Sequence, residues 1–272
     1  MKTRVITLLS SGITEATHTN ISVIPEVVKF YSEEEYIIGD DITLEKLYSR
    51  MSYDLNSYFE ITYDYNQIEK TFDKALENND RIFFIYDYID ELIINKLKEK
   101  YNEKLLLYKA KSFGYVIVNI ALEAERLFNK ENHRDYTVIN ALDYIDNNSY
   151  SILYSPKEDI LVSDYRYNGG LIENNERGIV RIFNGENLLE IKDKKTHPIN
   201  IMSKKLLELV NEDSTPFLMY SNPDSYYTDL LDQILNLAFP KVKNIKKVYV
   251  PLRIAKTYGF NSVILGVIRK EK

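Results

Sequence analysis

The amino-acid sequence predicts an α/β protein of two lobes, a parallel-sheet lobe at the N-terminus and a smaller mixed α+β lobe at the C-terminus. Short apolar, β-branched runs alternate with segments of helical periodicity through the first half. This alternation is typical of βαβ units around a parallel sheet. The polar stretch Asn147-Asn148-Ser149 interrupts it, and hairpin-like strands follow. We therefore place the two lobes at residues 1–148 and 149–272.

The strands expected in the first lobe are short, apolar and bounded by polar residues. They cover residues 5–9, 21–25, 81–86 and 105–108, and residues 26–31 continue extended. Helical periodicity covers residues 68–76, 91–101, 116–128 and 136–145. A further helix follows Thr43, whose hydroxyl suits the N-cap position.

The second lobe is expected to begin with a strand at 152–154 and a β-hairpin. The hairpin pairs residues 179–183 with 188–191, and Asn184-Gly185 between them favours a type I′ turn. Helices at 201–211 and 226–238 and strands at 216–220, 248–252 and 263–268 complete a mixed α+β arrangement.

Composition excludes several classes of chemistry. The chain has no cysteine, so disulfides, thiolate zinc sites and cysteine nucleophiles are ruled out. His18, His133 and His197 are scattered without metal-ligand spacing, and we interpret them as surface imidazoles. The adjacent Asp40 and Asp41 are interpreted as residues that order the turn after Gly39. We expect no metal site and no cofactor.

Charge and hydropathy suggest where the protein works. The net charge of −6 argues against a nucleic-acid partner, and we interpret the basic stretch at 241–247 as a solvated loop. No apolar run is long enough to span a membrane. The apolar residues 5–9 are too few for a secretory signal. We expect a cytoplasmic protein without an integral membrane segment.

Nothing in the sequence supplies a nucleophile, a base and an orienting group together, so we expect no catalytic residues and no enzyme. No Gly-x-Ser-x-Gly elbow is present. Ser10 and Ser11 follow the first strand, where α/β sheets place ligand loops. Both a ligand contact and an ordinary turn remain open there, because the glycine pattern of a nucleotide loop is missing.

Five segments together resemble the DegV family of bacterial fatty-acid-binding proteins. They include a strand ending in proline, a Gly-x-Asp-Ile-Thr segment before a helix and a glycine-containing hairpin. The segments follow in order along nearly the whole chain: Ile21-Ser22-Val23-Ile24-Pro25, Gly39-Asp40-Asp41-Ile42-Thr43, Lys111-Ser112-Phe113-Gly114, Phe183-Asn184-Gly185-Glu186 and Val263-Ile264-Leu265-Gly266-Val267.

The resemblance implies that the first lobe holds one fatty acid in a tunnel, with the carboxylate near the lobe junction. It further implies a partner kinase that makes the acyl-phosphate. Thr62 stands in the segment that matches the family's Thr-Ser-Gln-Pro-Ser contact. Arg253, Lys256 and Thr257 stand where the family's His-Thr-Gly-Pro-Gly segment belongs. With Ser10 and Ser11, these are the candidate ligand-binding residues.

The chain also departs from the family pattern. Asp87 and Asp90 stand where a Ser-Gly loop belongs, and their carboxylates would repel an anion. Leu8 and Leu9 replace an Asp-Ser pair after the first strand. We therefore keep a second reading, an interaction or regulatory protein whose tunnel is filled by side chains. An enzyme is a third reading, because dihydroxyacetone kinases have a related first lobe, but no equivalent of their covalent histidine is present.

Overall fold

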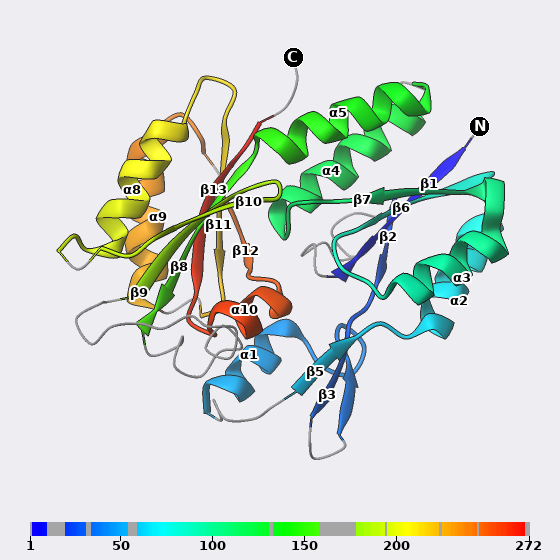
Figure 1. The fold of residues 1–272 in the computed structure, drawn as a ribbon, viewed down its shortest axis with the longest axis horizontal. Coiled ribbons are helices and arrows are strands. Elements are labelled where there is room, and N and C mark those ends of the chain that lie inside the picture. Colours follow the sequence, from blue (N-terminus) through cyan, green and yellow to red (C-terminus); the bar gives the residue numbers. More distant parts are fainter. Residues whose placement is uncertain are drawn as a thin grey trace. The chain divides into compact units, whose positions relative to one another are not determined.

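The computed structural model describes residues 2–9, 20–30, 34–53, 59–130, 133–157, 178–193, 195–222, 225–243 and 245–269, and Figure 1 shows their fold. Up to Lys270, the chain divides into two compact units. The first comprises Met1–Ile42 and Tyr58–Asp146, and the second comprises Thr43–Ser57 and Asn147–Lys270. This division differs from the limits expected from the sequence, which put residues 43–57 in the first lobe.

A four-stranded parallel sheet forms the centre of the first unit, in the order β2-β1-β6-β7. Its strands are β1 (Thr3–Leu8), β2 (Ile21–Ile24), β6 (Arg81–Tyr86) and β7 (Leu105–Lys109). The predicted parallel sheet is thus confirmed.

A small antiparallel sheet, ordered β4-β3-β5, follows β2 in the same unit. Its strands are β3 (Val27–Phe30), β4 (Glu35–Ile37) and β5 (Phe59–Thr62). The sequence analysis missed β5, because four residues carry too little periodicity to mark a strand.

Helices cover both faces of the parallel sheet (Figure 1). Ile6 and Leu8 of β1 pack in one buried cluster with Phe72 and Leu97, which lie on two helices of the same face. Thr7 points to the opposite face, because neighbouring strand residues alternate. The helices are α2 (Tyr65–Leu76) and α3 (Glu91–Tyr101) on the first face, and α4 (Tyr115–Glu125) and α5 (Asp135–Asn148) on the second. A short 3₁₀ turn (Asn102–Lys104) follows α3, and a π-helical turn (Arg126–Lys130) follows α4.

A buried carboxylate holds the turn between β7 and α4. Asp146 of α5 is fully buried and accepts hydrogen bonds from the backbone N–H groups of Lys111 (2.8 Å) and Ser112 (2.9 Å). The Tyr108 hydroxyl also donates to it, at 3.4 Å. Burial and the nearby carboxylates of Asp146 and Asp143 raise the pKa of Tyr108, which keeps this donor protonated.

The second unit is built on a six-stranded mixed sheet, in the order β10-β9-β8-β13-β11-β12. β11 and β12 are parallel and the other neighbours are antiparallel. The strands are β8 (Tyr150–Pro156), β9 (Gly178–Asn184), β10 (Asn187–Ile191), β11 (Thr215–Tyr220), β12 (Lys246–Tyr249) and β13 (Val263–Ile268).

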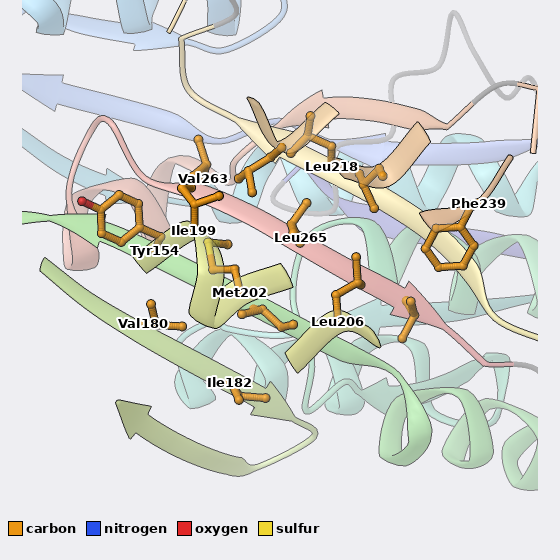
Figure 2. Packing of buried hydrophobic residues seen from close by; sticks show 14 residues of the cluster. Tyr154, Val180, Ile182, Ile199, Met202, Leu206, Leu218, Phe239, Val263 and Leu265 are labelled. Carbon is orange, nitrogen blue, oxygen red and sulfur yellow. The ribbon is translucent and has the colours of Figure 1, made fainter. Parts of the chain in front are cut away.

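Two helices, α8 (Pro198–Leu209) and α9 (Tyr226–Ala238), cover one face of this sheet. Met202 and Leu206 of α8 and Leu231 of α9 are fully buried against Leu265 of the central strand β13 (Figure 2). The sheet with these two helices confirms the predicted mixed α+β lobe.

The hairpin between β9 and β10 forms where the sequence predicts it, but its turn differs. Asn184 pairs with Asn187, so Gly185 and Glu186 are the two turn residues. Gly185 has φ +54°, whereas Glu186 is not among the described residues with positive φ. A type I′ turn needs positive φ at both positions, so the prediction was wrong, and glycine in first place indicates type II′. The Asn184 side chain instead donates to the carbonyl oxygens of Asn147 and Ser149.

Helix α1 (Leu44–Tyr53) is grouped with the second unit because it packs beside β12. The Tyr48 hydroxyl donates to the Val250 carbonyl at 2.6 Å, and the Tyr48 ring stacks on Tyr249 with centroids 5.8 Å apart. Thr43 Oγ1 accepts from the Lys46 N–H at 3.3 Å, which confirms the predicted cap. After Val250 the chain forms α10 (Leu252–Tyr258), whereas the sequence analysis extended a strand to residue 252.

Replacing Asp146 with alanine should lower the free energy of unfolding by about 2–6 kcal/mol. The buried N–H of Ser112 and the part-buried N–H of Lys111 would lose their acceptor, at about 1–3 kcal/mol each. Urea unfolding checks this. Asp143→Ala is the control, since Asp143 is half-buried and accepts from the Tyr108 hydroxyl; it should cost about 1 kcal/mol. Equal losses in the two variants would contradict the role of Asp146.

Tyr48→Phe should lower the free energy of unfolding by about 1–3 kcal/mol, because the buried Val250 carbonyl would lose its side-chain donor. Tyr36→Phe is the matched control, since the hydroxyl of Tyr36 contacts the exposed Glu34. That variant should stay within about 0.5 kcal/mol of the parent. An unchanged midpoint for Tyr48→Phe would show that this hydrogen bond does not hold α1.

Candidate ligand site

The carboxyl edge of the parallel sheet is where a ligand is expected. The chain passes from β1 to β2 on one side and from β6 to β7 on the other, so β1 and β6 flank the topological switch point. Thr7, near the end of β1, is fully buried, and its hydroxyl has no hydrogen-bond partner in the described part of the chain. Ser10 and Ser11 lie outside the described residues, so their role stays a prediction.

The two acids expected to repel an anion order the turn after β6. Asp90 caps α3 by accepting from the Leu92 N–H at 2.8 Å, and its side chain is exposed. Asp87 Oδ1 accepts from the Tyr88 N–H at 2.8 Å. The exposure of Asp90 weakens the repulsion that the sequence suggested for it, because solvent screens an exposed carboxylate, whereas Asp87 is half-buried.

Thr62 ends β5 in the first unit, and its side chain is exposed. The neighbouring Tyr63 hydroxyl donates to Glu26 Oε1 at 3.0 Å, and both residues are buried. Glu26 comes after β2 and Tyr63 after β5, and the pair was not identified from the sequence. In the sequence, Glu26 follows the strand-ending Ile24-Pro25. A glutamate in that position is equally typical of a solvated turn.

The acidic pair and the described histidines have local structural contacts. Asp41 Oδ2 accepts from the Ile37 N–H at 2.7 Å beside Gly39, whose φ is +102°, so Asp41 is the residue of the pair that orders this turn. His197 Nδ1 accepts from the Ile199 N–H at 3.4 Å and caps α8. His133 is exposed, as predicted, and His18 lies outside the described residues.

Three predicted ligand residues come together on α10. Arg253, Lys256 and Thr257 are spaced i, i+3 and i+4, which places them on one face of this helix. All three are partly exposed. The Thr257 hydroxyl donates to the Arg253 carbonyl at 2.9 Å, so its proton is used within the helix. The face therefore carries two cationic side chains and a hydroxyl whose proton is already bonded.

A buried arginine contacts the end of this helix. Arg181 of β9 is fully buried; its Nε donates to Glu190 Oε1 at 2.7 Å and its Nη1 to Ser155 Oγ at 2.9 Å. Its guanidinium lies 4.7 Å from the ring centroid of Tyr258, the last residue of α10. The sequence analysis missed this cluster, although a two-residue hairpin turn places Arg181 opposite Glu190.

A polar hollow of about 620 Å³ opens at the amino end of β1, beside the last turns of α2. Its lining includes Lys2, Arg4, Lys70 and Lys74, together with the buried Glu125. None of the predicted ligand residues that the structure describes lines it.

Among the described residues, no group of three histidine, aspartate or glutamate side chains is placed to hold a metal ion. No described helix is long and apolar enough to cross a membrane.

Comparison with known proteins gives matches among solved structures alone. No family model and no curated protein matches the chain. DegV from Bacillus subtilis, a fatty-acid-binding protein, superposes with a TM-score of 0.78 at 13% identity, covering 99% of this chain and all of the other.

A fatty-acid-binding DegV family protein from Streptococcus agalactiae gives a TM-score of 0.77 at 16% identity, with both chains fully covered. A stearic-acid-binding protein from Eubacterium ventriosum gives 0.74 at 15% identity, covering 98% of each chain. Both lobes of this chain thus have the fold of the DegV structures, and the resemblance found in the sequence is confirmed at the level of the fold.

Proposed function

We propose that this protein binds a fatty acid or a similar lipid carboxylate and does not catalyse a reaction. The observation that carries the proposal is the full-length match to structures described as fatty-acid-binding proteins, one of them with stearic acid. The doubly wound sheet with its switch point between β1 and β6 gives such a ligand an accessible edge.

The carboxylate is recognised, on this proposal, through the cations of α10. Arg253 can form a bidentate pair with a carboxylate, and Lys256 lies one turn further along the same face. Thr257 contributes less than the sequence suggested, because its proton is already donated to Arg253. Thr62, Ser10 and Ser11 remain candidate hydroxyl contacts from the first unit.

The carrier role extends the proposal to a partner. A bound fatty acid would be presented in the cytoplasm to a separate kinase that phosphorylates its carboxylate. The chain would then supply binding and orientation, and the kinase would supply the catalytic groups. This role agrees with the absence of a nucleophile–base set in the sequence.

One observation favours a second candidate, an interaction protein with a filled tunnel. Leu8 and Leu9, which replace polar residues of the family pattern, are both buried. Leu8 packs in the cluster between the sheet and the helices α2 and α3. Apolar side chains at this edge remove polar contacts that a carboxylate would use.

Native mass spectrometry of the purified protein, followed by calorimetric titration of delipidated protein with myristic, palmitic and stearic acid, separates the two candidates. The carrier proposal predicts a co-purified acyl chain and saturable binding of one ligand per chain. Absence of both the co-purified acyl chain and saturable binding would contradict the carrier proposal and support the interaction protein with a filled tunnel.

Lys256→Ala and Arg253→Ala should each weaken fatty-acid binding by about 1.5–3 kcal/mol, the range for a hydrogen bond to a charged group. Lys205→Ala is the matched control, because Lys205 lies on α8 and pairs with Glu208 at 2.6 Å. That variant should bind as the parent does. Thermal unfolding without ligand should change little in all three variants, so a loss of binding would not reflect unfolding. Parent-like affinity in both α10 variants would remove this helix from the site.

A further inference from the structure

Two buried serines in the second unit have hydroxyls without a partner. Ser221 is 4% exposed and Ser262 is 0% exposed. Neither Oγ atom has a hydrogen-bond partner in the described part of the structure. A buried hydroxyl left unsatisfied is destabilising, and such groups are rare enough in native proteins to require an explanation.

The two serines lie just beyond the last residue pair of β11 and β13, at one end of the mixed sheet. Tyr220 of β11 pairs with Val263 of β13, and Ser221 and Ser262 are the next residues along these antiparallel strands. Val263 points into the core under α8 and α9. Because neighbouring residues alternate in direction, both serines belong to the opposite face of the sheet.

Helix α10 is attached to the chain beside this pair at both ends. The Val250 N–H, just before the helix, donates to the Tyr220 carbonyl at 2.8 Å. The Ser262 N–H donates to the carbonyl of Gly259, just after the helix, at 3.2 Å. The contact of Tyr258 with Arg181 places the end of α10 on the same face as the serines, because Arg181 alternates with the core residues Val180 and Ile182.

We propose that Ser221 and Ser262 donate hydrogen bonds to the carboxylate of the bound ligand. A carboxylate has two acceptor oxygens, and each serine supplies one O–H donor, so the pair matches its chemistry. The charge is neutralised by the cations of α10, while the serines fix the position of the two oxygens. This inference rests on the proposed function and adds to it two contacts that are absent from the sequence-based set.

The arrangement predicts opposite effects on binding and on stability. Ser221→Ala and Ser262→Ala should each weaken palmitic-acid binding about ten-fold or more, as expected for loss of a hydrogen bond to a charged group. The double variant should lose more than either single variant. Without ligand, the melting temperature of these variants should be unchanged or higher, because an unsatisfied buried hydroxyl is removed.

Ser155→Ala is the matched control for stability. Ser155 is also a buried serine on this face, but its Oγ accepts from Arg181. Its replacement should lower the melting temperature of the ligand-free protein, because Arg181 loses an acceptor. The control shows that the assay detects the loss of a satisfied serine.

The outcomes separate this inference from the proposed function. Parent protein that binds palmitic acid, with both alanine variants binding equally well, would overturn the serine contacts and leave the proposed function intact. A fall in ligand-free melting temperature like that of Ser155→Ala would show that the hydroxyls already have structural partners, and would also overturn them. Parent protein that binds no fatty acid would refute the proposed function, and the serine contacts with it.

Discussion

Arg181 imposes the strongest constraint on the second unit. Its guanidinium is fully buried, so its charge needs a carboxylate and its N–H groups need acceptors. Glu190 comes from β10, Ser155 from β8 and the Tyr258 ring from α10. Removing one partner of such a cluster costs far more than the cluster contributes as a whole, because a buried charge remains. The position of α10, and hence of the cations proposed to meet the ligand, depends on it.

Buried polar groups of this protein differ in how fully they are hydrogen-bonded within the described residues. Asp146 shows full compensation, with two backbone N–H groups and a tyrosine hydroxyl around one buried carboxylate. Thr7, Ser221 and Ser262 show none among the described residues. The first arrangement fixes a turn in one geometry, whereas the hydroxyls of Ser221 and Ser262 are the donors proposed for a ligand carboxylate. Polar side chains thus support the fold where they are hydrogen-bonded within the chain, and are proposed to contact a ligand where they are not.

The fold could be predicted from the sequence where an apolar pattern extended over a whole strand or helix. It was predicted less well where contacts between residues distant in sequence determine the position of an element. Regular apolar runs identified the parallel strands, α9 and β13. The pattern could not find α10, because seven residues after a strand carry little periodicity. It also could not assign α1 to the second unit, since that depends on Tyr48 meeting Val250, 202 residues away. For the candidate site, motif likeness proposed Arg253 and Lys256, whereas an unpartnered buried serine is visible only once the neighbouring strands are paired.

Helix α1 belongs to the second unit, although it lies between two segments of the first unit in the sequence. The chain passes between the units at residues 42–43, 57–58 and 146–147, so neither unit is one continuous piece of sequence. A fragment ending at residue 148 would carry α1 without the strand against which Tyr48 stacks. Exchange of one half between two relatives by a single recombination event would mismatch this helix with its support. The Tyr48–Val250 contact thus joins two segments of the second unit that lie on either side of residues 58–146 of the first unit.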